Sequence, residues 1–252
     1  MEGKKLVLTG ESWQTLELHI KGFDMFYRGE YEEGADDLRT ALSGAGIEVD
    51  YMPCHMAPNE FPESSNTIGQ YDTVILSDVG YNTLAVPTKS FTEFKRTPNR
   101  LDLLDAYVEA GGSLLMIGGY MSFQGIKGEG GYHKSTVEDI LPVTMEPFDD
   151  RVECSEGVVP EVIDSDHAIT EDLSEEWPYF LGYNQVTPDE DSKALVEVNA
   201  DPLLVVGDHG DGRVAAFTSD CAPHWGPPAF TEWEQYSDLW TNIITWLVDG
   251  DA

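Results

Sequence analysis

Residues 110–125 read A-G-G-S-L-L-M-I-G-G-Y-M-S-F-Q-G, and this stretch decides the fold. The apolar run Ser113 to Ile117 has no polar alternation, which is typical of a parallel strand that is covered on both faces. Gly118 and Gly119 then permit a sharp turn that side chains would obstruct. We therefore expect a buried strand that ends in a tight turn, with Tyr120 and Ser122 just beyond its carboxyl end, where open α/β sheets place their sites.

The turn at Gly118-Gly119 has the pattern of a nucleophile elbow, in which a strand-to-helix turn exposes one reactive side chain. The middle position of this turn is Tyr120, which is neither Ser nor Cys. The stretch therefore predicts a fold and a pocket more firmly than it predicts a reaction.

The chain on both sides of this stretch alternates between strand and helix patterns, which favours a doubly wound, mostly parallel sheet. Glycine-rich residues 207–212 separate two apolar runs and predict a β-hairpin near the C-terminal end. We expect an α/β, flavodoxin-like three-layer sandwich that forms a single domain over residues 1–252. The expected strands are Lys5–Thr9, Ile47–Met52, Tyr71–Ser77, Ser113–Ile117, Val158–Ile163, Ala194–Val198, Leu203–Val206 and Arg213–Thr218; the expected helices are Tyr31–Ala45, Pro98–Ala110 and Trp233–Leu247.

The charge balance is unusual, because 47 acidic and 14 basic residues give a formal net charge of -33. The acidic residues are spread along the chain instead of forming one tail. Such a surface is typical of proteins adapted to high salt, where screening removes self-repulsion. We therefore expect a halophilic source. The absence of a basic patch argues against nucleic acid as a partner.

The first ten residues contain too short an apolar run for a signal peptide, and no stretch approaches the length of a membrane span. Cys54, Cys154 and Cys221 are odd in number and lack the spacing of metal ligands, which favours reduced thiols. The sequence therefore predicts a cytoplasmic protein without a membrane partner. It predicts neither a metal nor another cofactor.

Polar and aromatic residues follow several predicted strands, and a doubly wound sheet would gather them on one rim. Tyr120, Ser122 and His224 are the candidate catalytic residues. The candidate ligand-binding residues are Glu11, Ser12, Trp13, His55, Asp78, Asn82, Thr83, Gly119, Asp220 and Trp225.

Each candidate also has a structural interpretation. Tyr120 could donate a hydrogen bond to a ligand or act as an aromatic lid, and Ser122 could be an activated hydroxyl or the cap of a following helix. His224 is the best acid–base candidate because it follows the last predicted strand, but it could instead pack between its neighbours. Glu11 and Asp78 could form a carboxylate pair or a metal site, although no metal-binding motif supports the latter.

Several motifs resemble the glutamine amidotransferase-like family of the class I glutamine amidotransferase-like superfamily. These include G-E-S-W at residues 10–13, G-G-Y-M-S-F-Q-G at 118–125 and T-S-D-C-A-P-H-W-G-P-P at 218–228. Residues 207–219 are similar, more distantly, to the hairpin of ThuA-like proteins. The resemblance spans nearly the whole chain and implies a flavodoxin-like fold with its pocket at the elbow.

The same resemblance implies that the usual reaction is lost. A class I amidotransferase needs a cysteine at the elbow and a histidine-x-glutamate pair, whereas this chain has Tyr120 at the elbow and Trp225-Gly226 after His224. We therefore expect the chain to bind or process a small polar metabolite at the strand-end pocket.

Two other functions stay open, and so does self-association into a homo-oligomer. The first is a hydrolase that uses Ser122, or a water activated by Glu11, Asp78 or His224. The second is a structural or interaction subunit, which an exposed apolar patch away from the rim would favour.

Overall fold

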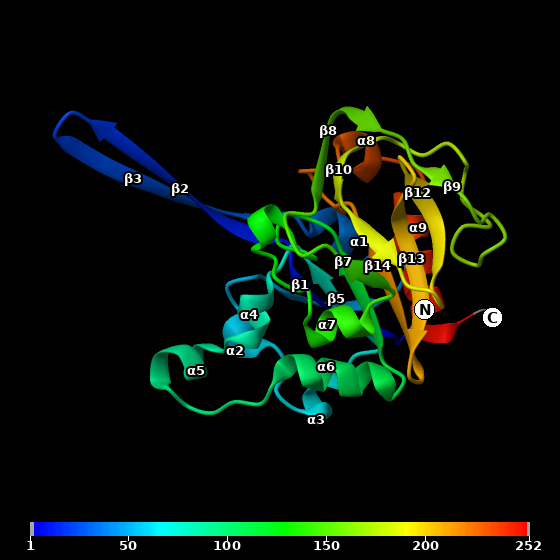
Figure 1. The fold of residues 1–252 in the computed structure, drawn as a ribbon, viewed down its shortest axis with the longest axis horizontal. Helices are drawn as coiled ribbons and strands as arrows, with labels where there is room; N and C mark the ends of the chain where they lie inside the picture. The colour runs from blue at the N-terminus through cyan, green and yellow to red at the C-terminus, as the bar shows by residue number, and fades with distance from the viewer. Residues whose placement is uncertain (1–2, 251–252) are drawn as a thin grey trace.

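The structure is a computed structural model that describes residues 3–250, and its centre is one eight-stranded sheet in the order β4-β1-β5-β6-β14-β13-β12-β9. The first five strands of this order are parallel, and the last three alternate in direction. This arrangement, shown in Figure 1, confirms the predicted α/β class with a mostly parallel sheet. The strands are β4 (Glu48–Met52), β1 (Lys5–Gly10), β5 (Thr73–Ser77), β6 (Ser113–Ile117), β14 (Gly212–Phe217), β13 (Asp201–His209), β12 (Lys193–Val198) and β9 (Glu161–Val162).

Helices cover both faces of the sheet and complete the three layers. In β1, Leu6 and Leu8 pack on the face covered by α1 (Asp36–Gly44) and α9 (Tyr236–Asp249). Val7 points to the opposite face, under α6 (Arg100–Glu109) and α7 (Thr136–Ile140). The apolar runs lack alternation because each side chain enters a core, whichever way it points. The remaining helices are α2 (Ala57–Glu60), α3 (Ser65–Ile68), α4 (Tyr81–Ala85), α5 (Thr88–Glu93), α8 (Pro228–Thr231) and the 3₁₀ turn η1 (Ile126–Gly128).

Two small antiparallel pairs stand beside the antiparallel half of the main sheet. β8 (Arg151–Val158) pairs with β10 (Phe180–Asn184), and β7 (Val143–Met145) pairs with β11 (Val186–Pro188). The predicted C-terminal hairpin is confirmed, since β13 and β14 are joined through Gly210 and Asp211.

The elbow stretch folds as predicted in its first half only. β6 spans the predicted strand, and Gly118 passes so close to the neighbouring chain that a Cβ would lie 2.2 Å from the Thr218 carbonyl oxygen. No helix follows directly, because residues 120–125 form an irregular loop. The Asp150 carboxylate accepts the backbone N–H groups of Gln124 and Gly125, both at 2.8 Å, in place of the bonds of a helical turn.

A long hairpin, which the sequence interpretation missed, leaves the body directly after β1. β2 (Ser12–Lys21) and β3 (Asp24–Glu33) pair along their whole length and project from the rest of the protein (Figure 1). The expectation of a helix from Tyr31 was wrong, because residues 31–33 belong to β3 and α1 begins at Asp36. We call residues 12–33 the arm.

Candidate functional site

Three acidic residues meet at the carboxyl ends of three parallel strands of the main sheet. Glu11 follows β1, Asp78 follows β5, and Asp220 lies three residues after β14. Glu11 and Asp78 have positive φ angles of 46° and 45°, a conformation that costs a non-glycine residue free energy. Such strain persists only where the surrounding structure imposes it, and it is concentrated at functional sites. The predicted convergence of strand ends is therefore present in the structure, with backbone strain at two of its members.

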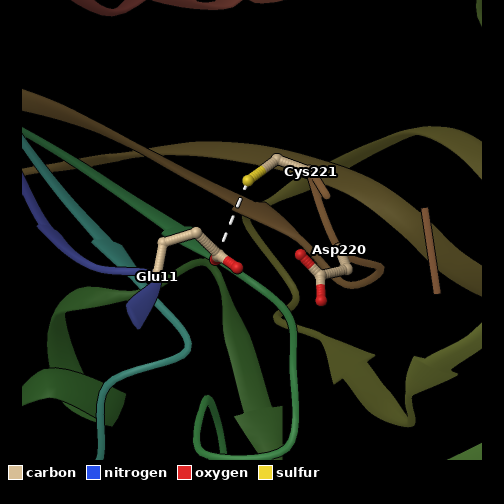
Figure 2. A group of neighbouring side chains, drawn as sticks. All are labelled: Glu11, Asp220 and Cys221. Atoms are coloured by element: carbon tan, nitrogen blue, oxygen red, sulfur yellow. Dashed lines mark hydrogen bonds between the residues drawn. The ribbon is translucent and has the colours of Figure 1, made fainter. Parts of the chain in front are cut away.

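The Glu11 carboxylate is buried and held by its neighbours. Ser77 Oγ donates a hydrogen bond of 2.6 Å to Glu11 Oε2, and Cys221 Sγ lies 3.8 Å from the same oxygen. Figure 2 shows the Glu11 carboxylate between Cys221 and Asp220. Asp220 is also buried, and its Oδ1 accepts the Ala222 N–H at 3.1 Å.

Burial makes all three carboxyl groups hard to ionise. Burial, followed by repulsion from Asp78, raises the pKa of Glu11 to about 8. Burial and the negative charges of Glu11 and Asp78 raise the pKa of Asp220 well above its ordinary value. Burial also raises the pKa of Asp78, although the Met121 N–H and the electrostatic interaction with His224 oppose the shift. All three carboxyl groups therefore hold their protons to a higher pH than an exposed carboxyl group does.

No Lys or Arg side chain within residues 3–250 pairs with this group, and of the three carboxyl groups only Asp78 interacts with a histidine, His224. Lys and Arg side chains there form their ion pairs with other carboxylates, and none of them contacts Glu11, Asp78 or Asp220. Buried carboxyl groups are normally paired or protonated, since an isolated buried charge is costly. A proton or a positively charged group of a ligand would therefore lower the electrostatic cost of burying these carboxyl groups.

Gly119 and Ser122 shape the turn around Asp78. The φ angle of Gly119 is 146°, and a Cβ there would lie 2.7 Å from Asp78 Oδ1, which explains the glycine. Ser122 Oγ donates to the Ile117 carbonyl oxygen at 2.5 Å and accepts the Asp78 N–H at 3.0 Å. Ser122 therefore does not cap a helix as one interpretation held; its hydroxyl fastens the β6 turn to the β5 turn.

Tyr120 lies in a cluster of aromatic and charged side chains. Its ring centroid is 4.6 Å from that of His224 and 5.6 Å from that of Trp225, and the Arg151 guanidinium lies 4.9 Å from its centre. Glu153 accepts from both Tyr120 Oη (3.1 Å) and Trp225 Nε1 (3.2 Å). Trp225 is buried, whereas His224 is exposed.

A second group of predicted residues lies at the root of the arm. Ser12, Trp13 and His55 line a cavity of about 240 Å³ together with Tyr31 and Cys54. Ser12 Oγ accepts the Cys54 N–H at 2.8 Å, and Cys54 Sγ lies 3.6 Å from the Asp78 carbonyl oxygen. Through Cys54, this cavity therefore borders the backbone at Asp78.

Asn82 and Thr83 are not brought into either group. Both lie on α4, and the contacts described for residues 3–250 include none between their side chains and the three carboxyl groups. The strand-end rule selected them because they follow β5, but the chain turns away after Asp78.

Some residues of the site were not predicted from sequence. Ser77, Arg151 and Glu153 contact predicted residues but lie within strands, and Cys221 lies in the 218–228 motif without the spacing of a metal ligand. Only a long-range contact identifies such residues, and a single sequence does not reveal it.

Glu11, Asp220 and Cys221 together could hold a metal ion. One ligand atom from each lies within 4.8 Å of the others, and all three residues are buried. A set of two carboxylates and one thiolate would suit a borderline cation such as Zn²⁺. Burial raises the pKa of the Cys221 thiol well above its ordinary value, so such an ion would have to displace that proton.

The family profile described as "Putative glutamine amidotransferase" matches residues 5–249. No protein with a curated description matches the chain. Among solved structures, "Cytoplasmic Protein STM1381 from Salmonella typhimurium LT2" is 42% identical, with a TM-score of 0.94 over 97% of this chain and 100% of that one. "Cytoplasmic Protein STM3548 from Salmonella typhimurium" is 41% identical, with a TM-score of 0.93 over 96% of this chain and 98% of that one.

A ThuA-like protein from Bacteroides uniformis shares the fold at 14% identity, with a TM-score of 0.61 over 99% of this chain and 93% of that one. The distant likeness to ThuA-like proteins is thus one of architecture. A halophilic source has no support in these relatives. The extent of the profile match and the two relatives above 40% identity lead to one conclusion: the chain belongs to the glutamine amidotransferase-like family.

Proposed function

We propose that this protein binds a small polar metabolite at the strand-end site, and that the metabolite carries an ammonium or amide group. The observation that carries the proposal is the group Glu11, Asp78 and Asp220, three strand-end carboxyl groups that no Lys or Arg pairs with. A ligand with N–H donors or a positive charge would satisfy them, and His224 and Tyr120 offer it an aromatic wall.

Conventional glutamine hydrolysis is not part of this proposal. That reaction needs a thiolate at the elbow, where this chain has Tyr120. The two thiols near the site do not replace it, because burial raises the pKa of Cys54 to about 11 and that of Cys221 well above its ordinary value. Thiols that stay protonated at neutral pH are poor nucleophiles.

One observation favours a second function, a hydrolase that activates water. A carboxyl group with a pKa of about 8, such as Glu11, can accept or donate a proton near neutral pH, which is what a general base requires. Ser122 is less suited to a nucleophilic role, because its hydroxyl is bonded on both sides within the turns.

The location of the protein also belongs to this proposal. Both Salmonella relatives are described as cytoplasmic proteins, and we propose the same compartment here. None of the helices in residues 3–250 has the length and apolar character that a bilayer span requires. A reduced compartment also suits Cys54, Cys154 and Cys221, none of which is in a disulfide.

Thermal unfolding with defined probes tests the binding proposal. L-lysine, agmatine and L-glutamine present ammonium, guanidinium and amide groups, and succinate serves as an anionic control. A ligand at a hundred times its Kd stabilises the folded state by about 2.7 kcal/mol, which raises Tm by several degrees. We expect at least one nitrogen-bearing probe to raise Tm and succinate to have no effect.

Two substitutions make this test specific. Asp78→Asn keeps an oxygen for the Met121 N–H but removes the charge, so it should abolish the Tm shift. Glu175→Gln removes a charge from an exposed loop and should leave the shift intact. Equal shifts in the wild type and Asp78→Asn, or no shift with any probe, would contradict the proposal. Release of ammonia from L-glutamine by the wild type, but not by Glu11→Gln, would favour the hydrolase.

A further inference from the structure

The arm reaches far beyond the body of the protein. Each of its strands has ten residues, which at ~3.3 Å per residue gives a length of roughly 33 Å. A two-residue turn at Gly22 and Phe23 joins the strands, and the φ angle of 66° at Gly22 suits such a tight turn. In Figure 1 the arm extends away from the other elements, and its residues from Gln14 onward are exposed.

Strand register sorts the side chains of the arm into two unlike faces. Leu18 lies opposite Tyr27 and Ile20 opposite Met25, so these side chains share one face with Leu16. The other face carries charged cross-strand pairs, including Glu17 with Arg28 and Lys21 with Asp24. We call the first of these the apolar face. Between Gln14 and Tyr31 it contains no charged residue.

The apolar face is exposed to an extent that a lone hairpin does not sustain. The exposed fractions are 69% for Leu16, 56% for Leu18, 68% for Ile20, 66% for Met25 and 73% for Tyr27. Two-stranded hairpins are marginal in water, and exposed apolar patches of several hundred Å² mark interaction surfaces. With about two thirds of five large side chains exposed, the patch measures on the order of 600 Å². Phe23 at the tip adds to it. This approaches the ~800 Å² per partner of a standard protein interface.

We propose that the apolar face is a self-association surface, covered by the arm of a second copy of this chain around a two-fold axis. Around such an axis the same patch serves both partners, and two sheets that stack face to face lie about 10 Å apart. The charged faces of both arms would then remain in water.

The net charge of the chain explains why two copies would contact each other through the apolar face. Two copies with a net charge of -33 repel each other over most of their surfaces, but the apolar face lets them approach without opposing carboxylates. The test below distinguishes this arrangement from one in which another segment of the second copy covers the apolar face. α5 and the loop after it expose Phe91 and Phe94 beside Lys89, Lys95 and Arg96, and this segment has the opposite charge to the arm.

Sedimentation equilibrium over a concentration series tests the proposal, with one lysine placed on either face. We expect the wild type to form a dimer of twice the 27.9 kDa chain mass. Leu18→Lys buries a charge in the interface and should raise the dimer Kd by about a hundredfold or more. Thr15→Lys, on the opposite face and across from Glu30, should leave the Kd unchanged. Equal melting temperatures of the two variants show that the body is folded.

Salt and cross-linking separate the two arrangements. An apolar arm-to-arm contact between acidic chains should tighten from 0.1 to 1 M KCl, since screening removes repulsion. A contact with α5 would weaken, because it depends on opposite charges. A photo-cross-linker in place of Tyr27 should capture residues 12–33 of a second chain. A monomeric wild type at both salt concentrations, equal Kd values for the two lysine variants, or cross-links to residues 86–96 would overturn the proposal.

Discussion

Replacing Glu11 with glutamine measures how far burial opposes ionisation at the strand-end site. Glutamine has the same shape and keeps an oxygen for the Ser77 hydroxyl, which donates 2.6 Å away in the wild type. The substitution therefore removes the titrating proton while leaving the packing in place. It isolates the electrostatic contribution of one buried carboxyl group to folding.

The size and sign of the effect follow from linkage. The pKa of Glu11 rises from 4.5 to about 8 on folding, so between these pH values the folded protein holds a proton that the unfolded chain has lost. The free energy of unfolding of the wild type therefore falls as pH rises, by up to ~1.4 kcal/mol per pH unit. Over the whole window this amounts to roughly 5 kcal/mol as an upper bound, and the glutamine variant lacks this slope.

Urea denaturation at pH 5, 7 and 9 measures the difference in unfolding free energy between Glu11→Gln and the wild type. We expect this difference to be small at pH 5 and to favour the variant increasingly at pH 7 and 9. Loss of the Glu11 charge also relieves Asp78 and Asp220, which adds to the gain at high pH. Glu175→Gln, at an exposed position, should give a difference without this pH dependence. A Glu11→Gln difference that is constant within about 1 kcal/mol from pH 5 to 9 would refute the reasoning.

Three further predictions concern the turn, the aromatic wall and the surface charge. Gly119→Ala places a Cβ within 2.7 Å of Asp78 Oδ1 at a φ angle of 146°, so chemical denaturation should show a loss of about 1–3 kcal/mol. Gly44→Ala, where a Cβ meets nothing within 4 Å, should cost nothing. Tyr120→Ala and His224→Ala remove incompletely buried side chains, so calorimetry should show weaker ligand binding with Tm nearly unchanged; normal binding by both would place the ligand elsewhere. With a net charge of -33, the protein should have a higher Tm in 1 M KCl than in 0.05 M KCl, and an equal Tm would show that self-repulsion does not limit stability.

The sheet was predictable because burial leaves a direct trace in the sequence. The run Ser113 to Ile117 is apolar at nearly every position, and this fixed β6 to the residue. Glycines at 207–212 likewise identified the β13–β14 hairpin. In both cases the signal is local, so neighbouring residues were enough to identify the element.

The arm was missed although its pattern is present in the sequence. Leu16, Leu18 and Ile20 alternate with polar residues, and Gly22 marks a two-residue turn. Alternation of this kind is usually explained by one face packing on the body, whereas here neither face does so. The rule that polar turns follow buried strands also favoured a loop after Gly10.

The candidate site was predicted in composition but not in geometry. The strand-end rule gathered Glu11, Asp78 and Asp220 correctly on one rim. It could not reveal the positive φ angles of two of these residues, because residues other than glycine seldom adopt them and no glycine stands at either position. Nor could it reveal Glu153, which reaches Tyr120 from β8.

The arm and the candidate site are joined through the backbone of Glu11, so events at one can affect the other. Glu11 immediately precedes the first residue of the arm, and its carbonyl oxygen accepts the Gly34 N–H at 2.9 Å, just after the last residue of the arm. The backbone of Glu11, one of the three acidic residues of the site, therefore holds both ends of the arm together at its base. We expect a second copy bound to the arm to change the affinity of the site for its ligand, and the ligand to change the affinity of the arm for that second copy by the same factor.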